Sequence, residues 1–169
     1  MKHFFEYNSP VGAIRIIDNG KAITSIKFVI NNPVPPSDTE EKETTLLQEA
    51  IQQLSEYFAG NRTVFDIPIE VQGTDFQKRV WNALCTIPYG ETRTYKQIAG
   101  LAACPKGARA AGMANNRNPI SIIIPCHRVI GADGSLTGYA AGLTIKQKLL
   151  NLESSDDDVD VTGKFSVMK

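Results

Sequence analysis

The chain has 169 residues, of which 42% are hydrophobic and 21% charged, a balance typical of folded globular proteins rather than disordered ones. No apolar run reaches the roughly 18 residues that a membrane-spanning helix needs. The N-terminus lacks the apolar stretch of a signal peptide, and the three cysteines lack disulfide-framework spacing. We therefore expect a cytoplasmic protein with reduced thiols and no membrane partner.

The net charge is zero, but the charges are unevenly distributed along the chain. Residues 1–71 contain six Lys or Arg against ten Asp or Glu, and residues 153–169 contain two against five. Residues 72–152 contain ten Lys or Arg against three Asp or Glu. A basic segment between acidic flanks is typical of a polyanion-binding region, although a merely basic solvated surface stays open as an alternative.

Residues 3–30 are rich in β-formers and predict strands separated by turns at 8–10 and 18–20. The three prolines within 31–39 exclude both a helix and a central strand there. A helical stripe predicts a helix over 39–59, ended by Gly60, and 63–71 predicts a last strand. Residues 1–71 thus predict a strand-rich layer covered by one helix.

Charge and pattern both change at 72–74, which we take as a domain boundary. A helix is predicted from Thr74–Asp75 to about residue 86. Two short helices over 94–102 and 106–116 then predict a helix-turn-helix. The second is almost bare, with alanine or glycine at most positions and only Arg109 and Met113 as large side chains. Such a helix fits either tight helix packing or close approach to a nucleic-acid backbone.

The last third contains a predicted buried strand or extended segment over 118–124, a loop with hairpin signals over 131–142, and a helix over 143–153. We expect the inward face of this helix to be apolar, formed by Leu143, Ile145, Leu149, Leu150 and Leu152. Residues 155–169 begin acidic and lack periodicity, which predicts a mobile tail.

Cys126, His127 and Arg128 follow the apolar run directly. A cationic or basic neighbour lowers the pKa of a thiol and makes it a nucleophile, but a buried structural thiol stays an open alternative. Neighbours in an extended segment point to opposite sides, so a Cys126–His127 contact needs a turn at Pro125 or a bridging water. A histidine base also needs an orienting group, for which the basic segment and its edge offer four carboxylates: Asp75, Glu91, Asp133 and Glu153.

The heptad IPCHRVI at 124–130, together with residues 74–99 and 105–153, resembles the O6-alkylguanine-DNA alkyltransferases, also called methylated-DNA–protein-cysteine methyltransferases. The resemblance covers residues 1–154. It implies an α/β (α+β) fold: a ribonuclease-H-like sheet with a helix over 1–71, and a mostly helical, winged-helix or helix-turn-helix-like domain over 72–154. It further implies a monomer without metal or cofactor, with cooperative binding along DNA left open.

The implied activity is a single, irreversible transfer of an alkyl group from O6 of guanine in double-stranded DNA to Cys126, after nucleotide flipping. O4 of thymine is a further candidate position. The resemblance implies that His127 activates Cys126 through a water and is oriented by Glu153. It implies that Asn118 holds the segment around Cys126, and that Tyr95 donates a proton to the departing guanine.

The remaining implied roles concern DNA and the base pocket. Arg109 would enter the base stack from a helix lying in the minor groove. The DNA-binding residues implied are Tyr95, Ala108, Arg109, Ala110, Gly112, Met113 and Arg117. The pocket residues implied are Pro125, Val129, Tyr139, Ala140 and Ala141, the last two at positions where the family often has glycine or serine.

Three rival functions are weaker. A lesion-binding protein of the same fold without transfer would typically lack the acceptor cysteine. A cysteine hydrolase would give the bare basic helix no purpose. A transcription factor would present several polar side chains on its reading helix, where 106–114 offers mostly methyl groups.

Overall fold

A computed structural model describes residues 1–31 and 33–154, and the predicted mobile tail lies outside the described residues. The described chain forms two compact units. The first comprises residues 1–71 with 119–121, and the second comprises residues 72–118 with the described residues from Ile122 on.

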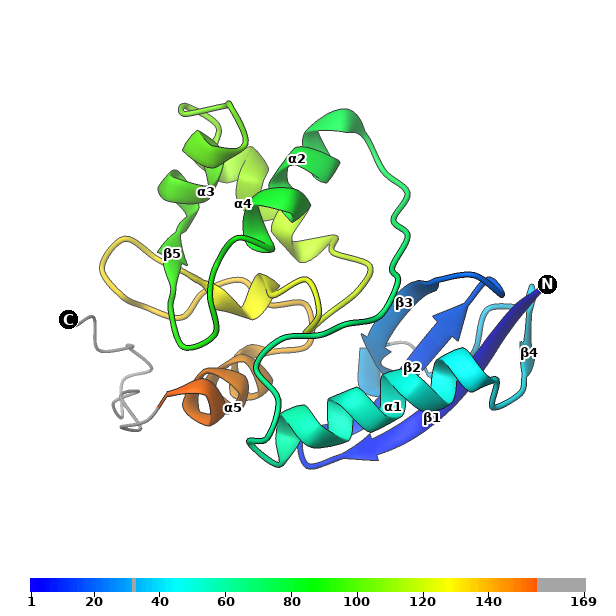
Figure 1. Ribbon diagram of the computed structural model, residues 1–169. Coiled ribbons are helices and arrows are strands. Elements are labelled where there is room, and N and C mark those ends of the chain that lie inside the picture. Colours follow the sequence, from blue (N-terminus) through cyan, green and yellow to red (C-terminus); the bar gives the residue numbers. More distant parts are fainter. Residues whose placement is uncertain (32, 155–169) are drawn as a thin grey trace. The chain divides into compact units, whose positions relative to one another are not determined.

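The first unit is a four-stranded sheet with one helix on it (Figure 1). Its elements are β1 (Lys2–Ser9), β2 (Gly12–Asp18), β3 (Ile23–Phe28), the 3-10 turn η1 (Val29–Asn31), β4 (Thr39–Glu41) and α1 (Thr45–Phe58). The sheet order is β3-β2-β1-β4, with β1–β2 and β2–β3 antiparallel and β1–β4 parallel. The predicted strands and turns of 3–30 are confirmed. Fully buried side chains of the sheet and of α1 form the core, among them Ile14, Ile16, Leu47, Leu54 and Tyr57.

Two predictions in this unit are wrong. The helix begins at Thr45 rather than at residue 39, because Thr39–Glu41 pairs with β1 and Thr44 then caps α1 by accepting from Leu47 N. The predicted strand over 63–71 reduces to one bridge, Ile69 to Ile23. Pro68 interrupts the segment, since proline has no N–H to donate to a ladder.

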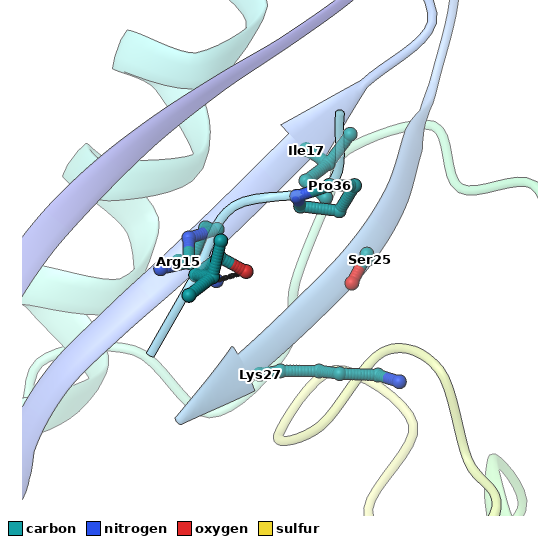
Figure 2. Close-up of a pocket in the computed structure, with 6 residues that line it drawn as sticks. Arg15, Ile17, Ser25, Lys27 and Pro36 are labelled. Carbon is teal, nitrogen blue, oxygen red and sulfur yellow. Dashed lines mark hydrogen bonds between the residues drawn. The ribbon is translucent and has the colours of Figure 1, made fainter. Parts of the chain in front are cut away.

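A pocket opens on the face formed by β2 and β3 (Figure 2). The guanidinium of Arg15 in this pocket donates to Oε2 of Glu6 from Nε at 3.0 Å and from a terminal nitrogen at 2.8 Å. It also donates to the carbonyl of Val34. No cysteine, histidine or carboxylate is among its lining residues, which are Arg15, Ile17, Ser25, Lys27, Val34 and Pro36. Ser25 and Lys27 are the polar side chains that remain, and no histidine or carboxylate lines the pocket to activate them.

The second unit is mostly helical (Figure 1). Its elements are α2 (Asp75–Leu84), β5 (Arg93–Thr94), α3 (Tyr95–Leu101), α4 (Ala108–Asn116), the 3-10 turn η2 (Cys126–Arg128), β6 (Val129–Ile130) and α5 (Leu143–Glu153). The four predicted helices are confirmed, and Thr74 and Thr94 form complete capping boxes on α2 and α3. Trp81 of α2 donates its indole N–H to the carbonyl of Ala114 at 2.9 Å, which ties α2 to α4.

Two short elements were not predicted: β5 and β6, which pair in parallel and place the start of α3 beside the end of η2. Of the buried strand or extended segment predicted over 118–124, no strand is formed. Ile120 makes one bridge to Ile26 in the first unit, and Ile122 has φ 76°. A β-branched residue in that region is a genuine outlier, and it breaks the extended run immediately before Cys126.

The connection between α3 and α4 is tight. Ala103 adopts φ 61°, and Gly107 N donates to Cys104 O at 2.8 Å. A Cβ on Gly107 would lie 2.5 Å from Cys104 Sγ and 3.2 Å from Cys104 O.

We therefore expect Gly107→Ala to lower the free energy of unfolding by about 1–3 kcal/mol, because the new methyl group overpacks this turn. The midpoint of urea unfolding measures the change. Gly100→Ala is the matched control: nothing lies within 4 Å of its Cβ position, and α3 should gain about 0.5–1 kcal/mol. Equal effects of the two substitutions would contradict the expected clash.

Candidate active site

Cys126, His127 and Arg128 form the single 3-10 turn η2. The turn is closed by a hydrogen bond from Arg128 N to the carbonyl oxygen of Pro125 at 3.0 Å. Of the two alternatives that the sequence left open, a turn after Pro125 is present. All three side chains are buried, with His127 fully inaccessible. The turn removes the strict alternation of an extended chain, so neighbouring side chains need not point to opposite sides.

The carboxylate of Glu153, at the end of α5, binds two of these side chains. His127 Nε2 lies 2.7 Å from Oε2, and Arg128 places Nε 2.7 Å from Oε1 and a terminal nitrogen 3.0 Å from Oε2. Arg128 also donates to the carbonyl of Ile87 at 2.7 Å. Of the four carboxylates that the sequence offers, the fold brings Glu153 to His127.

The ionisation of Glu153 sets the tautomer of His127. Burial alone would raise the pKa of Glu153, but the charge of His127 and the hydrogen bonds from His127 and Arg128 outweigh it and hold that pKa well below 4.5. An ionised carboxylate only accepts, so His127 Nε2 must carry the proton that lies between them. The basic nitrogen of neutral His127 is then Nδ1, which is buried without a hydrogen-bond partner in the described part of the chain.

Burial raises the pKa of the Cys126 thiol. Hydrogen bonds from the side chains of Asn118 and Tyr139 and the positive charge of Lys146 act in the opposite direction. Cys126 is buried, with only 4% of its surface exposed. A thiol with a raised pKa is largely protonated at neutral pH, so it requires a base before it can act as a nucleophile.

Two asparagines hold the backbone of this segment. Asn118 Nδ2 donates to Ile124 O at 2.7 Å, bridging the region around the strained Ile122. Asn115, at the buried side of α4, donates from Nδ2 to the carbonyl of Cys126 at 3.4 Å. The backbone on both sides of the thiol is therefore fixed by side-chain amides.

Tyr95, the first residue of α3, interacts electrostatically with Cys126. Its hydroxyl donates to Thr137 O at 2.8 Å, and its ring lies next to Gly112 of α4, where a Cβ would be 3.5 Å from the ring. Burial raises the pKa of Tyr95; its hydrogen bond to Thr137 lowers that pKa and the Cys126 charge raises it further. A methyl group at this position would make ordinary van der Waals contact with the ring, so α3 and α4 are close here without excluding an alanine.

The small residues of α4 serve two faces. Ala111 and Ala114 are buried and allow tight packing, whereas Arg109, Ala110 and Met113 are exposed. Ala108 and Gly112 are half-buried, and Arg117, the C-terminal cap, is exposed. The two alternatives that the sequence left open for this helix are therefore compatible: one face of α4 packs inside the protein, and the other exposes small residues and Arg109.

The residues proposed for the pocket differ in burial. Pro125 and Val129 are buried beside the thiol turn, Tyr139 and Ala141 are half-buried, and Ala140 is exposed. The loop over 131–142, predicted as such, contains these last three residues. Among the described residues, no cluster of three or more His, Cys, Asp or Glu could hold a metal ion. No helix of the described chain is long and apolar enough to cross a membrane.

The sequence did not predict the contacts that three residues make at the site: Arg128, Asn115 and Lys146. Lys146 and Glu153 are both buried on the inward face of α5, where only leucine and isoleucine were predicted, while Leu143 is 47% exposed. The prediction of an apolar inward face is therefore wrong at these positions. The sequence did contain a signal for this, because Lys146 and Glu153 are seven residues apart and such a spacing places two side chains on the same face of a helix.

Comparison with known proteins agrees with this geometry. The chain matches the family model of 6-O-methylguanine DNA methyltransferase in two parts, the ribonuclease-like domain over residues 4–71 and the DNA binding domain over residues 75–155. A methylated-DNA–protein-cysteine methyltransferase of Methanosarcina barkeri is 52% identical over 151 residues, covering 88% of this chain and 94% of that protein. One of Mycobacterium tuberculosis is 45% identical and covers 96% and 98%.

Solved structures give the same result for the fold. The crystal structure of the Mycobacterium tuberculosis protein in complex with DNA superposes with a TM-score of 0.85 at 44% identity, covering 92% of this chain and 96% of that one. A second structure of that protein gives 0.84 at 43% identity. The chain belongs to the 6-O-methylguanine DNA methyltransferase family, the methylated-DNA–protein-cysteine methyltransferases. The predicted fold class and the resemblance are both confirmed.

Proposed function

We propose that this protein repairs DNA directly, by moving the alkyl group from O6 of guanine in duplex DNA to Sγ of Cys126, once per molecule. The observation that carries the proposal is the buried Cys126–His127–Glu153 arrangement in a member of this family. The complex of the Mycobacterium tuberculosis relative with DNA supports DNA as the partner. O4-alkylthymine is a second candidate substrate.

The reaction that we propose begins with a proton transfer. The Cys126 proton passes through a water to Nδ1 of His127, and Glu153 stabilises the resulting imidazolium through Nε2. The thiolate attacks the alkyl carbon, the carbon–sulfur bond forms, and the bond from that carbon to O6 breaks with its electron pair moving to guanine. Tyr95 donates its proton to the departing base. Asn118 keeps the nucleophile segment in place throughout.

Flipping gives the thiol access to a base that is stacked in the duplex. Extruding a nucleotide costs a few kcal/mol, and less where the base pair is weakened, as with O6-alkylguanine. We propose that the exposed face of α4 lies in the minor groove and that Arg109 enters the stack. Ala108, Ala110, Gly112, Met113 and Arg117 would complete this face, and Pro125, Val129, Tyr139, Ala140 and Ala141 would line the base pocket.

The direct test is the mass of the tryptic peptide 118–128 after incubation with a duplex containing O6-methylguanine. We expect one added methyl group per protein molecule, and none with Cys126→Ala. Binding to the lesion without added mass would overturn the transfer and leave a lesion-binding protein. Added mass on the peptides of Cys85 or Cys104 instead would exclude Cys126 as acceptor.

Arg109→Ala should slow methyl transfer from duplex DNA by about 10-fold or more, because the flipped nucleotide loses the side chain that replaces it. Reaction with free O6-benzylguanine, which needs no flipping, should stay within about twofold of wild type. Arg109→Lys is the matched control for charge, and its rate of transfer from duplex DNA should lie between those of wild type and Arg109→Ala. An equal loss on duplex and free base would argue against entry into the stack.

The remaining features of the proposal concern organisation. We propose that residues 1–71 and 72–154 are separate domains, and that the protein acts as a cytoplasmic monomer. The three cysteines, all free, support a reducing compartment. Sedimentation with and without DNA distinguishes a monomer from a cooperative assembly along the duplex.

A further inference from the structure

Lys146 is a fully buried lysine, one turn into α5, that the proposed reaction does not use. Lysine is almost never fully buried unless it is paired. Its ammonium donates to the carbonyl oxygen of Thr137 at 2.7 Å and lies 5.8 Å from the centroid of the Tyr95 ring. Such a position over a ring is that of a cation–π contact.

The carbonyl of Thr137 has a second donor. The hydroxyl of Tyr95 donates to the same oxygen at 2.8 Å. The phenol that we propose as proton donor is therefore held, in the DNA-free protein, on an acceptor that it shares with Lys146. It must leave this oxygen to give its proton to the substrate.

We propose that Lys146 is a positioning residue for Tyr95, which prepares the phenol to release its proton to the base. The inference rests on the proposed function. The ammonium competes for the lone pairs of the Thr137 carbonyl and so weakens the bond that holds the Tyr95 hydroxyl. It keeps this carbonyl bonded when Tyr95 turns to the substrate. A cation at the ring also withdraws electron density and favours the phenolate that remains after proton donation.

Lys146 has a second neighbour, the Cys126 thiol of η2, and its effect there must be measured separately. The groups that face the ammonium are Tyr95 from α3, Cys126 from η2 and the Thr137 carbonyl from the loop. Glu153, on the same face of α5, is about 10 Å further along the helix axis and is bonded to His127 and Arg128. A charge effect on the thiol changes its reactivity toward any alkylating agent, whereas an effect through Tyr95 requires a leaving base.

This difference defines the experiment. Methyl transfer from an O6-methylguanine duplex is measured for wild type, Lys146→Met, Tyr95→Phe and the double variant. Each rate constant is divided by that of Cys126 alkylation by iodoacetamide at the same pH, read on peptide 118–128. The ratio removes the contribution of Lys146 to the thiol. Lys148→Met, an exposed lysine of the same helix, is the control and should leave the ratio unchanged.

We expect the ratio to fall roughly 10-fold in Lys146→Met, the scale of one hydrogen bond to a charged group. In the double variant it should be no lower than in Tyr95→Phe alone. An unchanged ratio in Lys146→Met, or losses that multiply in the double variant, would overturn the inference. Absence of transfer by wild type would instead overturn the proposed function, so the two failures are distinguishable.

The wild-type protein supplies the same information without a change at Lys146. Burial lowers the pKa of Lys146 to about 8, although the Cys126 charge acts in the opposite direction. The ammonium is therefore present below about pH 8 and lost above it, so the ratio should fall as the pH rises through that value. The profile of Tyr95→Phe should be flat across this range. A flat profile in wild type as well would contradict a role of the charge.

Discussion

Glu153→Gln is expected to lower the free energy of unfolding by about 3–5 kcal/mol at pH 7, because it leaves the buried guanidinium of Arg128 without its carboxylate. Breaking a buried ion pair on one side costs more than the pair contributes, since the remaining charge stays desolvated. Urea unfolding at constant pH measures the change. Methyl transfer should fall as well, because a neutral amide can no longer stabilise a positive His127.

The double substitution Glu153→Gln with Arg128→Met separates these effects. Removing both charges should recover much of the lost stability, while transfer stays low because His127 still lacks its carboxylate. Recovery of transfer together with stability would show that Glu153 acts through folding alone.

The pH dependence has a definite sign. The folded pKa of Glu153 lies below its ordinary value of 4.5, so its contribution to stability is complete above that value and is lost as the pH falls toward the folded pKa. The acid side of the stability profile should be shallower in Glu153→Gln. A profile parallel to wild type would contradict the pairing.

Lys146→Met is expected to raise the free energy of unfolding by about 1–2 kcal/mol at pH 7. The pKa of Lys146 drops from 10.5 to about 8 on folding, mainly through burial. Keeping this group charged below pH 8 therefore lowers the stability of the folded protein by about 3 kcal/mol. The variant gains less than this amount, because it also loses the hydrogen bond from Lys146 to Thr137. Methionine has a similar length and no charge to bury.

The same shift predicts how wild-type stability varies at alkaline pH. Between about pH 8 and 10.5 the unfolded chain binds the proton that the folded protein has lost, so stability should rise with pH across this window. This rise should be smaller in Lys146→Met. A variant less stable than wild type at pH 7 would mean that Lys146 is retained for structure rather than for the reaction.

Local rules were sufficient for the helices of the second unit. Thr74 caps α2 as its sequence position predicts, and Val80, Trp81 and Leu84 of this helix are buried. The errors arise where a partner distant in sequence decides the structure. Residues 39–41 become a strand because β1 is beside them, and Ile120 finds its partner in β3 rather than in a ladder of its own. No local pattern contains that information.

The candidate site divides in the same way. Cys126 and His127 became candidates because they adjoin in sequence, but only the family resemblance favoured a nucleophile over a structural thiol. Pro125 was compatible with the turn that η2 forms. The choice of Glu153 among four carboxylates came from the family resemblance, and the fold places it 2.7 Å from His127. Lys146 was missed, and the pairing of Arg128 with Glu153 was not foreseen, because charged residues are expected at the surface and only the fold shows that both are buried.

The face of α5 that bears Lys146 and Glu153 also limits how the length of this chain can change. One extra residue between them would rotate Glu153 by about 100° around the helix and carry its carboxylate away from His127. The loop over 131–142 lies outside the helix, so an insertion that keeps the carbonyl of Thr137 on Lys146 leaves the spacing of the two charges unchanged. Natural variation in length should therefore be concentrated before residue 143 and absent between 146 and 153.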